Sequence, residues 1–198
     1  MRWDNLFDDL ESQLEQGLSA EEVDLQAEEE RLRLGRLSLR DRIVAVHEAE
    51  NQASGPGLRM SLRGGRIVVL RPVAFGKDWL SADLLDSSDR RAQCILPLHA
   101  IDTLILTRHQ VDNSLRAPRE SERGLASRLG LAFVLRDLCR RRRAVTVELP
   151  DGELHGTIDR VGRDHVDLAV HEAGAARRDT AVSSYRVIPL DQLLLLLL

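Results

Sequence analysis

The sequence contains few of the residues that form disulfides, metal sites or stacking surfaces. Among 198 residues there are two cysteines, two tryptophans, one tyrosine and three phenylalanines. Cys94 and Cys139 cannot form a disulfide framework or a four-cysteine zinc site. No apolar run reaches the roughly 18–20 residues that span a bilayer. The N-terminus becomes acidic at Asp4, which is unlike a secretory signal peptide. We therefore expect a cytoplasmic protein with no membrane segment.

Recognisable catalytic patterns are also missing from the sequence. No paired carboxylates, Ser-His-Asp set or Cys-His set can be read from the spacing. No helix pattern follows Gly64-Gly65, so this pair predicts a turn and not a phosphate-binding loop. Ser183-Ser184 lacks the context of a nucleophile elbow. We predict that the protein is not an enzyme and uses no cofactor.

Six histidines remain as candidate ligands, and three of them cluster in the second half of the chain. These are His155, His165 and His171. Strand alternation places the first two on an outward face, but the expected turn near Gly162 pairs His155 near Ala169 and away from His165. We therefore predict no metal site there.

The charge is unevenly distributed, although the net charge is only −4. Residues 1–30 carry 11 acids against one base, a net of −10, whereas the other 168 residues carry 27 bases and 21 acids, a net of +6. Lys77 is the single lysine. The densest basic cluster is Arg140–Arg143. Basic clusters of this kind contact phosphate backbones, but a solvated surface, favourable charges at a helix C-terminus and a GC-rich codon bias explain arginines equally well.

Helical spacing occurs in four places. Trp3, Phe7, Leu10 and Leu14 form one stripe, and Ser19 with Glu22 resembles a capping box that starts a second acidic helix reaching Leu34. Ser38 with Asp41 begins a third helix. The fourth runs over residues 121–142, where we place Phe133 on the core face. Residues 108–120 are polar, contain Pro118 and indicate a linker.

Strand patterns separated by tight turns fill the rest of the chain, and they occur twice. The turn at Gly64-Gly65 aligns with Asp151-Gly152. Gly76-Lys77-Asp78 aligns with Gly162-Arg163-Asp164, and Pro97-Leu98 with Pro189-Leu190. Each copy is one helix followed by about five short strands. Because five short strands bury a core best by curling, each copy predicts a small barrel.

The second copy, Val145 to Leu168 with Tyr185-Arg186-Val187-Ile188, resembles the two motifs of the Sm-like (LSm) family. Gly156 stands where such barrels bend sharply, because a Cβ would hinder the bend. In the first copy, the segment from His99 to Leu104 is similar to part of the bacterial Sm-type RNA chaperone. The resemblance covers residues 36–106 and 121–198 and implies nucleic-acid binding.

The whole chain, including its opening from Arg2 to Leu10, also resembles a family from high-GC bacteria. Its members often carry the label Fis family transcriptional regulator. This resemblance implies a regulatory role, but the chain ends in a strand pattern where Fis-type proteins end in a helix-turn-helix.

We therefore predict an α+β protein with an N-terminal helical arm and two repeated helix-plus-five-stranded Sm-like or SH3-like barrels. The expected segments are the arm at 1–35, the first barrel at 36–107, the linker at 108–120 and the second barrel at 121–198.

The predicted function is non-catalytic, regulatory binding of RNA or DNA. The candidate contacts are Arg140, Arg141, Arg142, Arg143, Lys77, His99, Arg163 and Arg186. The alternative is a protein-interaction or assembly scaffold that binds no nucleic acid. It would associate with itself or with a protein partner through the N-terminal helices and the C-terminal leucines, Leu193–Leu198.

Overall fold

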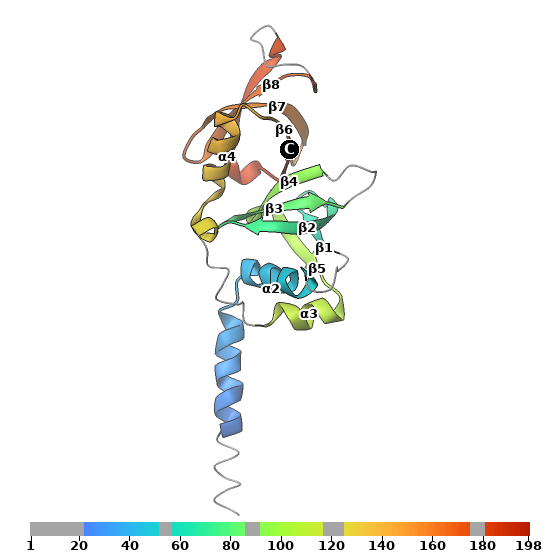
Figure 1. Ribbon diagram of the computed structural model, residues 1–198, viewed down its shortest axis with the longest axis vertical. Helices are drawn as coiled ribbons and strands as arrows, with labels where there is room; N and C mark the ends of the chain where they lie inside the picture. The colour runs from blue at the N-terminus through green and yellow to red at the C-terminus, as the bar shows by residue number, and fades with distance from the viewer. Residues whose placement is uncertain (1–21, 52–56, 86–91, 117–124, 175–180) are drawn as a thin grey trace, which may run out of the picture. The chain divides into compact units, whose positions relative to one another are not determined.

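The computed structural model describes residues 22–51, 57–85, 92–116, 125–174 and 181–198 (Figure 1). The chain divides into two compact units, Met1–Leu39 and Arg40–Leu198. The helix expected at Trp3–Leu14 lies outside the described residues.

The described part of the first unit is a helix over residues 22–35, which confirms the second helix predicted for the acidic arm. Its residues are almost all exposed. Two i,i+3 ion pairs lie along it, Arg31 to Glu28 at 3.3 Å and Arg33 to Glu30 at 2.6 Å. Such exposed pairs each contribute only a few tenths of a kcal/mol, about 0.2–0.5.

The first half of the second unit begins with a helix, α2 (Leu39–Asn51), as the sequence predicts. Ile43, Val44 and Val46 form its buried face. The strands that follow are β1 (Leu58–Leu62), β2 (Ile67–Phe75), β3 (Trp79–Leu84), β4 (Ala92–Pro97) and β5 (Ile101–Ile105), with the 3-10 helix η1 (Leu98–Ala100) between the last two.

The second half repeats this order. It begins with the 3-10 helix η3 (Leu125–Arg128) and the helix α4 (Leu131–Arg140). The strands are β6 (Ala144–Leu149), β7 (Gly152–Val161), β8 (His165–Val170), β9 (Ser184–Pro189) and β10 (Leu195–Leu197), with the 3-10 helix η5 (Leu190–Gln192) before the last.

The segment expected to be a linker contains a further helix, α3 (Arg108–Ser114). Thr107 and Gln110 form a complete capping box at its start, and Gln110 also donates a hydrogen bond to Glu50 of α2. Arg42 of α2 donates to Ser114 Oγ at 2.9 Å. Polar side chains thus attach α3 to α2, which explains why a polar sequence is ordered here.

The prediction of two repeated barrels is wrong. In the described residues, ten strands belong to one antiparallel sheet with the order β5-β1-β2-β3-β4-β10-β6-β7-β8-β9. The chain is mixed in helix and strand, as expected, but β10 pairs with β6 on one side and with β4 on the other. The pairing of β4 with β10 joins the two halves by backbone hydrogen bonds, so neither half closes into a barrel of its own.

Strand β10 is apolar on both faces, and each face packs into a different core. Leu195 lies in the cluster formed by α2 and strands β1–β4. Leu196 lies in the cluster formed by α4 and strands β6–β9. Successive strand residues point to opposite faces. A run of consecutive leucines is therefore what a strand shared between two cores requires.

Strand β4 is shared in the same way. Cys94 and Leu96 face the first core, whereas Ile95 faces the second, as does Trp79 at the start of β3. The two halves are therefore joined by side-chain packing as well as by backbone hydrogen bonds. One ion pair adds to this contact: Arg66, beside the β1–β2 turn, pairs with the nearly buried Glu148 of β6.

The aligned turns have the same local hydrogen bonds in both halves. Gly76 N–H donates to Trp79 O, and Gly162 N–H donates to His165 O, both at 2.8 Å. Leu98 N–H donates to Asp78 O at 2.9 Å, and the aligned Leu190 N–H donates to Asp164 O at 2.8 Å. The sequence alignment between the halves therefore gives the register of equivalent strands.

Gly156 is required by close backbone approach. A Cβ at this position would lie 2.3 Å from the carbonyl oxygen of Ala169 on the neighbouring strand β8. The prediction that a side chain would be hindered at Gly156 is confirmed, although the glycine lies in an open sheet and not in a closed barrel.

We expect Leu195→Ala to lower the free energy of unfolding by about 2–5 kcal/mol, because it leaves a cavity under the strand that both cores share. The matched control is Leu32→Ala, since Leu32 is 54% exposed and Leu195 is 0% exposed. Urea denaturation of both variants measures the difference. Equal stability of the two variants would contradict the role assigned to β10.

Candidate nucleic-acid interface

Helix α4 is held at its start by the first half of the chain. Its N-cap residue is Gly130, which has no side chain to accept a hydrogen bond from the helix. Asp78, in the β2–β3 turn, supplies the missing acceptor: its Oδ1 receives Leu131 N–H at 2.7 Å. Lys77 N–H and Trp79 Nε1 both donate to Leu129 O, at 2.9 and 3.0 Å. A carboxylate here also interacts favourably with the helix dipole.

The outward face of α4 combines one aromatic residue with arginines. Leu131, Leu135 and Leu138 are buried, whereas the exposed positions are Phe133, Arg136 and Arg140. Residues at i, i+3 and i+7 lie along one stripe of a helix. The prediction that Phe133 faces the core is wrong, because its side chain is 54% exposed. The sequence contains a signal for this: Leu131, Leu135 and Leu138 recur at i, i+4 and i+7, which places Phe133 on the opposite face of the helix.

The C-terminus of α4 ends in a Schellman motif built from arginines. Arg142 N–H donates to Cys139 O at 3.0 Å, and Arg143 N–H donates to Leu138 O at 3.2 Å. The motif requires a left-handed residue, normally glycine. Here that residue is Arg142, with a φ of 49°. The left-handed conformation costs a non-glycine residue about 1–2 kcal/mol, so an arginine at this position opposes the preference of the backbone.

Asp137 holds two of the arginines near the helix end. Its carboxylate pairs with Arg140 at 2.6 Å and with Arg141 at 2.7 Å. The hydrogen bond from Arg140, with the nearby charge of Arg141, lowers the pKa of Asp137. Both guanidinium groups remain largely exposed, so the pairs contribute little to stability. Their effect is to orient two cations outward from one position.

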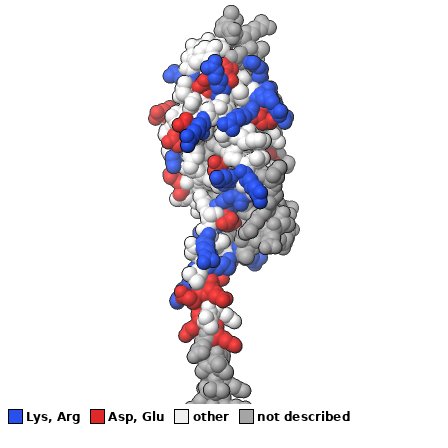
Figure 2. Space-filling view, turned by 90° about the vertical axis from the view of Figure 1, so that its left-hand side faces the viewer, with Lys and Arg blue, Asp and Glu red and all other residues white. Residues whose placement is uncertain are grey.

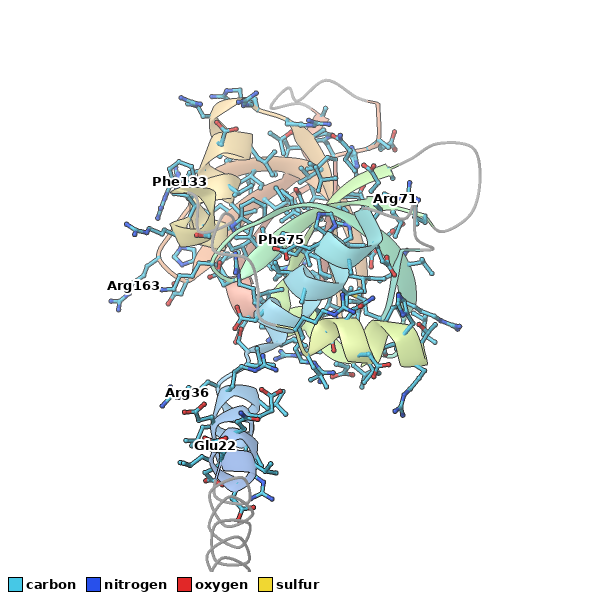
Figure 3. The ribbon with its side chains drawn as sticks, turned by 60° about the horizontal axis from the view of Figure 1, so that its bottom comes forward. Glu22, Arg36, Arg71, Phe75, Phe133 and Arg163 are labelled. Carbon is cyan, nitrogen blue, oxygen red and sulfur yellow. The ribbon has the colours of Figure 1, made fainter. Side chains whose placement is uncertain are left out.

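Lys77 and Arg163 lie in equivalent turns, and both turns lie against the α4 segment. The Lys77 backbone is bonded to Leu129 just before the helix, and Arg136 Nη2 approaches Gly162 O at 3.4 Å. Figure 3 shows Phe133 and Arg163 on the same side, with Arg163 pointing outward. Figure 2 shows the side on which α4 lies, with Lys and Arg side chains spread over it between acidic ones. We call Lys77, Phe133, Arg136, Arg163 and Arg140–Arg143 the α4 surface.

Two predicted contacts lie elsewhere. His99 is in η1 and half-buried, with Arg63, Asp78, Asp191 and the Leu193 backbone in its electrostatic surroundings. Arg186 lies on β9 beside Val187 and lines a shallow depression with the β6–β7 turn. Sequence reasoning therefore identified part of the α4 surface, added two residues that are not in it, and missed Phe133 and Arg136.

The three clustered histidines do not form a metal site. His155 and His171 pack edge to face with ring centroids 5.4 Å apart, while His165 Nδ1 is bonded to Asp164 at 2.8 Å. His171 Nε2 is bonded to Thr157 Oγ1 at 2.9 Å, which uses a potential ligand atom. In the described residues, no group of three or more histidine, cysteine or acidic side chains is placed to hold a metal ion.

No protein-family model, curated protein or solved structure matches this chain. The resemblances to the Sm-like family and to the Fis-labelled family therefore remain predictions. In the described ranges, no helix is long and apolar enough to cross a bilayer.

Burial lowers the pKa of three histidines, His47, His99 and His155. For His99 the charge of Arg63 adds to this effect, and for His155 the neighbouring His171 does. In the unfolded chain these groups bind protons near the ordinary histidine pKa of about 6.5. The folded chain binds fewer protons below that pH, so protonation favours the unfolded state.

We therefore expect the free energy of unfolding to fall as the pH is lowered from about 7 through 6.5 and below. Urea titrations at closely spaced pH values measure this slope, and His155→Gln should reduce it. A stability that stays flat or rises over the same interval would contradict the burial argument.

Proposed function

We propose that the protein is a non-catalytic regulator that binds single-stranded nucleic acid through the α4 surface. The observation that supports this most directly is the exposed Phe133 flanked on one helix face by Arg136 and Arg140. Proteins that bind single strands combine aromatic side chains, on which bases stack, with cations that follow the phosphate backbone.

The strained arginine at the helix end supports the same proposal. Glycine at position 142 would satisfy the Schellman motif without the left-handed penalty. A backbone strain that the sequence does not relieve is a reason to look for a function of the side chain. Arg142 extends the set of exposed cations beyond the end of α4, next to Arg141 and Arg143. A purely structural cluster would need the positive charge near the helix C-terminus but not an arginine at this particular position.

The geometry favours single strands over a duplex. Recognition of duplex DNA by a helix requires that the helix enter the major groove with several base-reading side chains. The exposed stripe of α4 offers arginines, which can read guanine, but between its two arginines and the helix start it presents a phenyl ring that makes no hydrogen bond with a base edge. Stacking on Phe133 needs an unpaired base. The expected binding is therefore largely independent of sequence and strongly dependent on salt.

Fluorescence anisotropy with labelled single-stranded RNA, single-stranded DNA and duplex DNA of one length tests this proposal. We expect the single strands to bind tightest and affinity to fall steeply between about 50 and 200 mM salt. Arg136→Ala should reduce the slope of log affinity against log salt concentration by about one, which is the contribution of one phosphate contact. Phe133→Ala should weaken single-strand binding by about 1–3 kcal/mol.

The matched control for Arg136→Ala is Arg108→Ala. Arg108 is an exposed arginine on α3, its ion pair with Asp112 is long at 3.8 Å, and its removal changes the net charge equally. Equal losses in the two variants would show a nonspecific charge effect. Absence of binding at the lowest salt concentration would contradict the proposal and favour the interaction-scaffold alternative.

Arg142→Gly separates a binding role from a structural one. We expect this substitution to raise the free energy of unfolding by roughly 1 kcal/mol, because the left-handed penalty disappears. The same variant should bind single-stranded nucleic acid more weakly. Arg142→Lys is the control that keeps the charge and the strain, and it should keep most of the affinity. An Arg142→Gly variant with unchanged affinity would show that Arg142 is not a contact.

A further inference from the structure

A depression of about 340 Å³ lies between β9 and the β6–β7 turn. Pro150, Asp151 and Glu153 line it from the turn, and Val187 and Pro189 line it from β9. In the described sheet β9 is the last strand, three places away from β6, so the curvature of the second half brings this turn back towards β9. No residue of the α4 surface lines the depression.

A second depression, of about 490 Å³, adjoins the first. Asp164, Leu190 and Asp191 line it, together with the same Val187 and Pro189. Depressions of roughly 300–1,000 Å³ have the size at which proteins bind ligands. An extended chain that followed β9 would therefore pass both of them. We call Asp151, Glu153, Asp164, Val187, Pro189 and Asp191 the β9 surface.

The outer edge of β9 leaves backbone groups available for pairing. β9 pairs with β8 and is the end of the strand order in the described sheet. Leu190 N–H donates to Asp164 O, and in an antiparallel pair the residues bonded to the partner strand alternate with residues that face away from it. The N–H and C=O groups of Tyr185 and Val187 therefore point away from β8.

Exposed apolar side chains on this edge favour a strand-like partner. Tyr185 and Val187 are 61% and 68% exposed, and alternate residues of a strand share one face. Natural proteins protect sheet edges with charges, prolines or bulges, because an unprotected edge pairs with other strands. An edge that exposes two apolar side chains is suited to receive an extended segment.

Carboxylates outnumber cations around the two depressions. Arg186 is the one arginine or lysine among the lining residues. Asp151, Glu153 and Asp191 are exposed, and the side chain of Asp164 is 83% exposed. These charges repel a phosphate backbone and attract lysine and arginine side chains. The chemistry of the β9 surface is therefore opposite to that of the α4 surface.

We propose that the β9 surface binds an extended, lysine- or arginine-rich segment of a partner protein, which adds to the sheet as a strand next to β9. In strand addition the main-chain hydrogen bonds supply affinity, and pockets beside the edge select side chains. An apolar side chain of the segment would pack on Val187, and basic side chains would lie near the carboxylates of each depression. This proposal does not depend on nucleic-acid binding by the α4 surface, so either can fail without the other.

Fluorescence anisotropy of the full chain with a labelled synthetic peptide, in which lysine alternates with valine, is the first test. We expect saturable binding that weakens as salt rises, and no binding when glutamate replaces lysine. A peptide of the same charge that is N-methylated at every residue cannot pair as a strand and should not bind. Equal binding of the methylated peptide would show charge attraction alone and would overturn the proposal. Absence of binding by the unmodified peptide at the lowest salt concentration would also overturn it.

Val187→Lys should abolish binding of the lysine–valine peptide, because it places a like charge where the two depressions meet. The exposure of Val187 lets this variant fold, which circular dichroism checks. Val73→Lys is the matched control: Val73 is 63% exposed on β2, which is already paired on both sides by β1 and β3. Wild-type affinity in Val187→Lys would overturn the assignment of the site.

The carboxylates are tested in pairs. Asp164→Asn combined with Asp191→Asn should weaken binding roughly three- to tenfold, the size expected from the loss of two exposed ion pairs. The matched control is Asp24→Asn combined with Glu29→Gln, which changes the net charge equally at two exposed positions of the helix over residues 22–35. Equal losses in the two double variants would show attraction by net charge and would overturn the proposal.

Amide hydrogen exchange followed by NMR locates the bound peptide. The N–H groups of Arg186 and Ile188 face β8 and should be protected without peptide, whereas those of Tyr185 and Val187 should become protected when the peptide is added. Unchanged exchange at Tyr185 and Val187 would overturn strand addition. Protection of these two amides without peptide, increasing with protein concentration, would show that a second copy of the chain covers the edge, and would overturn the proposal as well.

Discussion

The insertion of β10 between β4 and β6 is the contact on which the arrangement of the Arg40–Leu198 unit depends. Its leucines face two cores alternately, so neither core is complete without this strand. The backbone of the same strand satisfies hydrogen bonds on both of its neighbours. A strand buried on both faces must be apolar at every position, whereas a half-exposed strand alternates. The leucine run at the end of the sequence is therefore explained within the chain.

The α4 surface exists because the two halves are joined. Asp78 belongs to the first half, yet it caps the helix that leads the second half. Trp79 packs into the second core and bonds to Leu129 just before that helix. These contacts fix the N-terminal end of α4, while Leu135 and Leu138 fix its inner face. Phe133 and Arg136 are exposed as a consequence of that fixed rotation. Lys77 reaches the same region because it lies in the turn that holds the helix.

Much of the local structure could be predicted from the sequence, because turns and helix starts are determined by residues close in the chain. The glycine turns lie where the repeat places them, and α2 begins directly after Ser38, where the cap signal predicts a helix start. The joining of the halves could not be predicted, since a leucine run fits the last strand of a barrel as well as a strand shared between two cores of one sheet. The helix α3 was missed although its capping box, Thr107 with Gln110, is local. Its contacts with α2, such as Arg42 to Ser114, connect residues far apart in sequence and could not be predicted. Phe133 was misassigned although the local spacing of Leu131, Leu135 and Leu138 places it on the opposite face of α4.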